Sequence, residues 1–562
     1  MAKVKKTDYL YIAIFILFPL WNVTKGLEFA DTTCSLANYV YLDHLDSLWM
    51  YGYYLSNLLG GFFSILPFGN TMVGMNFYTS FLLSGTAVIA YAFLKNKIQR
   101  EILFIGIMLA LGLSWCPTVI LYNYLTYFFF TLASVCLYVA IVRKQEKWYV
   151  IAGVLLGMNI FARFPNVLEA ALILVVFYEA AFFSKGVIRK TLLCVGGYLA
   201  GVAICLLAIV LTGQIGEFVE MIGGLLFISK NSAGYSFTDM LLSMVRGYTM
   251  SFPYLALLIA ACVLGVAASY ILNKKFAANK MLHRIFYIGY SGCMVLLLFV
   301  LYRRGLWLFN YSAYESFFKL AAIFLMITIV CCVMVLISKK ESHEEKILAA
   351  IVLVIVLISP FGSNNGIFPS MNNLYLAAPF TLHILYKKTS KLPTVRISCA
   401  MFMAVLLVQA LLFKMGFVAR AGEPAWNLTT KVEGIERLEG IKTSEKNAES
   451  IMGLAEYLSA NELDGSPAIL YGNIPGLYYI LELKPAITNL WADLESNPSE
   501  VLKEDLENME GCPVLIVGSG VNLENKATDK EQMLYDYVTK NHYEVTYQNE
   551  GFVVYEAAAG NH

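Results

Sequence analysis

The stretch SFFKLAAIFLMITIVCCVMVLIS, residues 316 to 338, decides the fold of this chain. After Lys319 it contains no charged side chain until Lys339. A helix rises about 1.5 Å per residue and the hydrocarbon core of a bilayer is about 30 Å thick, so about 20 apolar residues cross it. The stretch is therefore predicted to be a membrane-spanning helix.

Similar apolar stretches recur through the first 416 residues. The chain has 562 residues, of which 58% are hydrophobic and 14% charged, and its mean hydropathy of +0.63 is far from that of a soluble protein. We predict a mostly α-helical fold, a polytopic membrane bundle of about thirteen transmembrane helices. The predicted spans are 8–25, 72–94, 101–116, 124–142, 148–163, 166–184, 191–212, 252–272, 285–302, 316–338, 347–360, 373–387 and 398–416.

The charge of the chain changes along its length. Residues 431–562 hold 9 basic and 23 acidic side chains, which leaves 32 basic and 17 acidic for the first 430. An acidic, charge-rich tail with alternating helix and strand patterns indicates a folded soluble domain, and neither part indicates a nucleic-acid partner. We predict a transmembrane domain over 1–416, a linker over 417–446 and an α/β domain over 447–562.

Sidedness follows from the basic residues. Of the 41 in the chain, 23 fall in the N-terminal segment and in six alternate connections between spans. Because positive charge collects on the cytoplasmic side, the N-terminus is predicted to be cytoplasmic, in a multi-pass protein of the plasma membrane. Thirteen spans then place the C-terminal domain and two long loops, 26–71 and 213–251, outside. This count requires the aromatic segment 48–66 to lie in the outer interface as a helix.

Several charged side chains lie at the predicted outer ends of spans, where an ionisable group suggests function. Asp31 follows the first span, but it also begins a helical stretch and would suit a helix N-cap. Arg163 precedes Pro165 at a helix end and suits either a lipid phosphate or the headgroups. Arg303 and Arg304 form an outer cationic pair. Glu315 and Lys319, spaced four apart, most simply neutralise each other and otherwise belong to the site.

Two stretches resemble one family of membrane enzymes. The first is GLEFADTTCSLANY, residues 26–39, directly after the first span, and the second is GVLLGMNIFARFPN, residues 153–166. They are similar to the first external loop and to the glycine-rich span ending in an Arg/Lys-Pro element of the GT-C superfamily of integral-membrane glycosyltransferases, in particular its protein mannosyltransferase-like and aminoarabinose-transferase-like members. The predicted layout, with a soluble domain outside, also matches.

The resemblance implies a function. It suggests transfer of a sugar from a polyprenyl-phosphate-linked donor to a glycan, lipid or protein acceptor at the outer face of the membrane, with inversion, and it gives Asp31 the role of catalytic base. A carboxylate suits removal of the acceptor proton, and guanidinium groups suit the leaving phosphate. The substrate-binding candidates are Arg163, Arg303, Arg304, Glu28, Glu315 and Lys319.

The chain departs from the superfamily pattern in its acids. Many relatives carry two adjacent acids in the first loop, whereas Phe29 and Ala30 separate Glu28 from Asp31, and residues 114–124 lack the second-loop acid. No metal ligand is therefore assigned, and no cofactor is assured, with a divalent metal kept as an alternative. Two further hypotheses stay open: a polysaccharide polymerase or ligase, which would not require Asp31, and a lipid-linked-glycan transporter, which predicts paired halves.

Overall fold

Each predicted span overlaps a helix in the computed structural model, which describes residues 5–183, 186–231, 236–495 and 497–558. Eight helical segments of this described part are long and apolar enough to cross a membrane by themselves. The chain is thus a multi-pass helical membrane protein, as its composition predicts. The helices are α1 (Lys6–Leu17), α5 (Met72–Leu94), α6 (Arg100–Leu113), α7 (Leu121–Arg143), α8 (Lys147–Asn159), α9 (Leu174–Phe182), α10 (Val187–Leu211), α13 (Phe252–Lys275), α14 (Lys280–Arg303), α15 (Phe318–Ile337), α16 (His343–Ile358), α17 (Ala377–Thr389) and α18 (Pro393–Gly416).

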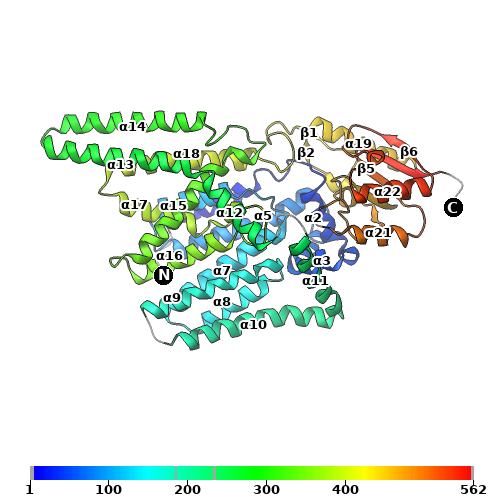
Figure 1. Ribbon diagram of the computed structural model, residues 1–562, viewed down its shortest axis with the longest axis horizontal. Coiled ribbons are helices and arrows are strands. Elements are labelled where there is room, and N and C mark those ends of the chain that lie inside the picture. Colours follow the sequence, from blue (N-terminus) through cyan, green and yellow to red (C-terminus); the bar gives the residue numbers. More distant parts are fainter. Residues whose placement is uncertain (1–4, 184–185, 232–235, 496, 559–562) are drawn as a thin grey trace.

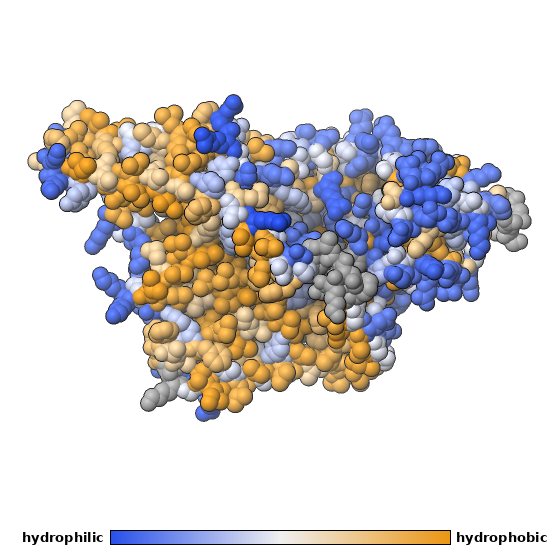
Figure 2. All heavy atoms as spheres, in the orientation of Figure 1, coloured by the Kyte–Doolittle hydropathy of each residue, from blue (hydrophilic) through white to orange (hydrophobic). Residues whose placement is uncertain are grey.

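Polarity divides the molecule along its longest axis. Helices fill one part, from which α13 and α14 project as a hairpin, and the C-terminal domain lies at the other end (Figure 1). Apolar side chains cover the helical part and hydrophilic side chains cover the C-terminal domain (Figure 2). Lipid therefore suits the first surface and water the second.

Glycines bring α8 and α10 into close contact. A Cβ on Gly153 would lie 2.0 Å from the carbonyl oxygen of Cys194, and one on Gly201 would lie 2.3 Å from that of Val154. Small residues four apart let two membrane helices approach this closely, and Gly157 and Gly197 complete both pairs. This packing fixes the end of α8, just before Arg163.

The two long loops fold into short helices. The first contains α2 (Asp31–Val40), α3 (Ser47–Gly52) and α4 (Tyr54–Ser64), and the second contains α11 (Ile215–Asn231) and α12 (Phe237–Thr249), with residues 232–235 outside the described part. The segment 48–66, predicted as one interfacial helix, is two helices that meet at Tyr53. Neither is long enough to span a membrane. Short 3₁₀ helices complete this part: η1 (Phe18–Leu20), η2 (Leu42–His44), η3 (Phe164–Ile173), η4 (Tyr314–Ser316) and η5 (Phe368–Asn373).

The C-terminal domain is built on a five-stranded sheet of order β4-β3-β5-β7-β6. β3 pairs in parallel with β4 and β5, whereas β7 runs antiparallel to both β5 and β6. The tail thus alternates helices and strands, as its patterns predict, and its last two strands, β6 and β7, form an antiparallel pair. The elements are α19 (Glu445–Ala460), β3 (Pro467–Tyr471), α20 (Leu477–Ile480), β4 (Lys484–Pro485), α21 (Ser499–Glu507), β5 (Val514–Gly518), η7 (Leu523–Asn525), α22 (Asp529–Lys540), β6 (Tyr543–Gln548) and β7 (Phe552–Ala557).

The segment predicted as a linker, 417–446, has structure of its own and joins the first loop. It forms β1 (Thr430–Lys431) and β2 (Lys442–Thr443), with η6 (Glu436–Leu438) between them. Backbone hydrogen bonds join Lys442 to both Thr24 and Gly26. The C-terminal domain and the first loop also share one apolar core, which includes Leu36 of α2 and Leu477 of α20. The domain is thus held directly over α2.

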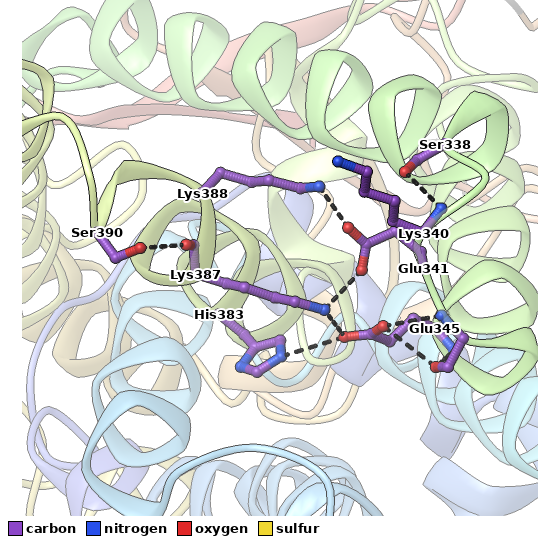
Figure 3. A network of polar contacts seen from close by, with 9 residues as sticks. Ser338, Lys340, Glu341, Glu345, His383, Lys387, Lys388 and Ser390 are labelled. Carbon is purple, nitrogen blue, oxygen red and sulfur yellow. Dashed lines mark hydrogen bonds and ion pairs between the residues drawn. The ribbon is translucent and has the colours of Figure 1, made fainter.

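At the far end of the helices, a network of ion pairs ties the turn before α16 to α17 (Figure 3). Lys387 lies 2.6 Å from Glu341 and 2.7 Å from Glu345, and Lys388 also pairs with Glu341. Burial raises the pKa of Glu341, but the two ammonium groups outweigh it and lower the pKa to about 2. His383 approaches Glu345 at 3.7 Å.

Candidate active site at the start of α2

Glu28 begins the site by capping α2. Its two carboxylate oxygens accept hydrogen bonds from the backbone N–H groups of Ala30, at 2.8 Å, and of Thr32. These are N–H groups that the first turn of a helix leaves without intrahelical partners. Burial raises the pKa of Glu28, against the hydrogen bonds that lower it. Glu28 thus caps α2, a role for which the sequence suggested Asp31.

Asp31 is the first residue of α2, and its side chain points to another partner. Its Oδ2 lies 2.6 Å from Nη2 of Arg420, and the two side chains are 45% and 49% exposed. Partial burial of the Asp31 carboxyl group raises its pKa. The nearby Arg420 lowers the pKa by less, so that it stays above its ordinary value. A half-exposed carboxylate of raised pKa is a better proton acceptor than an ordinary one.

Asp31 opens onto a cavity of about 510 Å³ between the helices and the C-terminal domain. Its polar lining includes Arg163, Asn364, Asn365 and Asn497. Its apolar lining comes from the first and second loops and from the chain after Arg163: Leu48, Phe164, Leu168, Leu225, Phe237 and Met240. The cavity thus has both polar and apolar lining residues. The polar ones include a carboxylate, Asp31, and a guanidinium group, Arg163.

Arg163 is held in this lining by its neighbours. Its Nη2 donates to the carbonyl oxygen of Gly362, and its guanidinium lies 5.6 Å from the ring centroid of Tyr122. Behind it, the Asn166 side chain donates to Thr126 Oγ1 at 2.7 Å and to the Asn159 carbonyl oxygen at 2.8 Å. These buried amides brace the turn that carries Arg163.

The C-terminal domain contributes Trp491 and Asn497 to the same lining. Asn497 Nδ2 donates to Asn489 Oδ1 and to the carbonyl oxygen of Trp491, at 2.8 and 2.7 Å. Lys530 Nζ donates to the carbonyl oxygens of Ala492 and Leu494. The indole N–H of Trp491 and Oδ1 of Asn497 are buried and have no partner among the described residues. The described residues of this loop are thus joined by hydrogen bonds, and two of their hydrogen-bonding groups remain unused.

The other predicted residues lie away from this cavity lining. Arg303 and Arg304 are exposed at the end of α14, and Glu315 is exposed in η4. Lys319 Nζ donates to the carbonyl oxygen of Gly305 at 2.9 Å. The predicted ion pair between Glu315 and Lys319 is wrong, since no such pair forms between these two described residues. The reason is that η4 ends before α15 begins, so the two do not share one helix face.

Arg420 is the main residue that the sequence did not single out. Arg420 follows the last span on the predicted outer side, against the charge trend, and the same reasoning that selected Arg303 would have found it. For Trp491, the sequence allows contact with an acceptor sugar but favours structural packing. A buried tryptophan in a soluble domain is usually a packing residue, and only the docking of that domain places it beside Asp31.

The residues around Asp31 do not fit a metal site built on two carboxylates. Both oxygens of Glu28 bind backbone N–H groups, and Asp31 pairs with a cation. Among the described residues, no group of three or more His, Cys, Asp or Glu side chains is arranged to hold a metal ion. A divalent metal therefore enters none of the steps proposed below.

No protein-family model matches the chain, and no curated protein matches it. Solved structures that are similar to the chain at low identity include the following three. The oligosaccharyltransferase of Archaeoglobus fulgidus, in complex with Zn and sulfate, has 11% identity and a TM-score of 0.48, covering 97% of this chain and 73% of that one. ArnT from Cupriavidus metallidurans, bound to undecaprenyl phosphate, has 11% identity and a TM-score of 0.44, with 99% of both chains covered.

The archaeal oligosaccharyltransferase AglB from Archaeoglobus fulgidus, with an inhibitory peptide and a dolichol-phosphate, has 10% identity and a TM-score of 0.46 over 99% of this chain and 74% of that one. Similarity of this extent assigns no role to any residue of the chain.

Proposed function

We propose that this chain is an integral-membrane glycosyltransferase that moves a sugar from a polyprenyl-phosphate-linked donor to an acceptor hydroxyl at the outer face of the membrane. One observation carries the proposal. A single cavity of about 510 Å³, at the junction of membrane helices and a hydrophilic domain, has both Asp31 and Arg163 in its lining. These are the general base and the phosphate-binding cation that such a transfer needs.

The two kinds of cavity surface suit the two parts of the donor. The apolar lining from Leu168, Leu225, Phe237 and Met240 suits the prenyl chain, which gains by leaving water. The amides of Asn364, Asn365 and Asn497 suit sugar hydroxyls, because an amide both donates and accepts. The donor would therefore lie with its phosphate between these surfaces, near Arg163.

The reaction then follows as one displacement. The acceptor oxygen attacks the anomeric carbon of the donor while Asp31 takes the acceptor proton. The bond between the anomeric carbon and the phosphate oxygen breaks, and its electron pair leaves with the lipid phosphate. Arg163 stabilises the charge that develops there, through charge-assisted hydrogen bonds. Attack opposite to the leaving group inverts the anomeric centre.

The test is replacement of Asp31 by Asn, compared with Asp43→Asn. Asp43 is an exposed carboxylate in η2 of the same loop, so it controls for the substitution itself. In membranes supplied with labelled polyprenyl-phosphate sugar, Asp31→Asn should lower transfer by about 10²- to 10⁴-fold, the usual contribution of a general base. Asp43→Asn should stay within about twofold, as a surface change away from the site. Normal transfer by Asp31→Asn, at normal expression, would refute the base.

A further inference from the structure

Arg420 has one polar partner and several unused donors. It lies between α18 and β1, and among the described residues its ionic or hydrogen-bonding partner is Asp31, at 2.6 Å. A guanidinium offers five N–H donors in a planar fork that matches carboxylate and phosphate oxygens. Since half of the Arg420 side chain is exposed, an anion reaching Asp31 can also reach Arg420.

The backbone and an aromatic ring hold Arg420 in this place. Its φ of 51° lies in the left-handed region, which a long side chain seldom occupies. Its guanidinium lies 5.9 Å from the ring centroid of Trp491, within the range of a cation–π contact. Asn497 donates to the carbonyl oxygen of Trp491 and Lys530 donates to that of Ala492, so these hydrogen bonds hold the backbone at Trp491 independently of Arg420.

Asp31 and a donor phosphate would compete for this cation. Both are anions, and both are placed at the same cavity by the proposed function. A base that keeps a guanidinium partner accepts a proton less readily, since the cation favours the charged carboxylate. Loss of that partner when the donor enters would make Asp31 more basic just when a proton must be taken.

We propose that Arg420 is exchanged between Asp31 and the phosphate of the lipid-linked donor, so that donor binding frees the base; this inference rests on the proposed function. Arg420 is then a positioning residue that couples donor binding to Asp31. The ligand chemistry is a phosphate ester on a long apolar chain. Trp491 steadies the guanidinium during the exchange, which gives the C-terminal domain a part in it.

A double-mutant cycle on phosphate binding tests the exchange. The full chain in lipid nanodiscs is titrated with a polyprenyl monophosphate, for the wild type, Asp31→Asn, Arg420→Gln and the double variant. Asp31→Asn should tighten binding, because it removes both a competitor and a like charge. In the Arg420→Gln background only the like-charge effect remains. The gain in affinity on Asp31→Asn should therefore be smaller by about threefold, the size expected for a half-exposed ion pair.

Controls separate this coupling from general effects. Arg189→Gln removes an arginine from another exposed pair, 2.7 Å from Glu146, and should not change binding. Arg420→Lys keeps the charge without the planar fork and should give an intermediate coupling. An unchanged melting temperature would show that the Arg420→Gln and Arg420→Lys variants both fold.

Two outcomes overturn the exchange. Arg420 does not move between the two anions if Asp31→Asn changes the affinity for the phosphate by the same factor with and without Arg420. The same conclusion follows if Asp31→Asn as a single substitution weakens binding. If phosphatidylglycerol shows the same coupling as the polyprenyl phosphate, the anion is a bulk headgroup and not the donor. Neither outcome depends on transfer, whereas the proposed function fails only if Asp31→Asn transfers sugar normally.

Discussion

Two groups of charged side chains lie near opposite ends of α5 and differ in how fully they are paired. Around Glu341 and Glu345, the carboxylate oxygens bind Lys387, Lys388 and the cap residue Ser342 (Figure 3). At the start of α2, Oδ2 of Asp31 has one partner, Arg420. Glu341 is a closed site, buried with both carboxylate oxygens paired, although Glu345 beside it lines a cavity of about 320 Å³. Asp31 is an open site on the cavity of about 510 Å³.

This difference distinguishes a carboxylate that stabilises the fold from one that can take part in a reaction. A buried carboxylate whose oxygens are all paired stabilises the helices that it joins, and it has little capacity left for a ligand. A half-exposed carboxylate with spare capacity beside a cavity can bind and react. Changes at the open site should therefore affect transfer, and changes at the closed one should affect stability. The following predictions test that division, from the largest expected effect on transfer to the smallest.

After Asp31→Asn, replacing Arg163 by Ala should have the largest effect on transfer. The leaving phosphate loses a fixed cation in the cavity, and loss of one such donor costs about 10²- to 10³-fold in kcat. The measurement is the rate of labelled sugar transfer at saturating donor. Arg303→Ala, at an exposed position on α14, should change that rate by less than about twofold. Equal losses in both variants would remove Arg163 from the site.

Gly476→Ala should loosen the C-terminal domain over the open site. A Cβ there would lie 1.7 Å from Oγ1 of Thr33 and 2.9 Å from the carbonyl oxygen of Phe29, so the domain must shift. A displacement of about 1 Å at a distance from the chemistry can cost about 100-fold in rate. We expect a loss of about 10- to 100-fold, together with faster proteolysis between the domain and the helices.

Gly520→Ala is the matched control, because a Cβ at Gly520 meets no atom within 4 Å. It should leave the rate of transfer and the proteolytic pattern unchanged. A slow, protease-sensitive Gly520→Ala variant would show that alanine in this domain disturbs it wherever it is placed.

Glu341→Gln should change stability rather than transfer. The pKa of Glu341 is lowered to about 2, so its stabilising contribution is complete above the ordinary carboxyl pKa of about 4.3 and is lost as the pH falls towards 2. The variant should lose about 1–3 kcal/mol at neutral pH. Its melting temperature should also fall less than that of the wild type on acidification, with transfer within about twofold.

Glu315→Gln should have the smallest effect. Glu315 is exposed in η4 and forms no ion pair with Lys319, so removal of its charge should leave both transfer and the melting temperature close to the wild-type values. A tenfold loss of transfer would place Glu315 in the site after all, where the sequence first suggested it.

Much of the helical part was predictable because lipid imposes a simple requirement. A span needs about 20 apolar residues with all backbone groups bonded internally, and this pattern is local in the sequence. The strand β4 was missed because it has only two residues, Lys484 and Pro485, and forms by pairing with β3. The division of 48–66 at Tyr53 was missed because both halves have the same composition.

The site was predictable in part. Asp31 and Arg163 were selected because each is an ionisable group at the end of a span; both line one cavity, and their roles in the reaction stay predictions. Glu28 was interpreted as a doubtful partner of Asp31, whereas it caps α2. That role depends on where the helix begins, to within one residue, which a sequence pattern does not specify.

The sequence by itself determined that this chain is a helical membrane protein with an acidic soluble domain after its last span, because hydropathy and charge act locally along the chain. Only the tertiary structure decided which charges meet. Arg420, in the segment that follows α18, reaches Asp31. Trp491 reaches Arg420 through docking of a domain that lies far from α2 in the sequence. Such contacts depend on how whole surfaces pack together, and no local pattern encodes them.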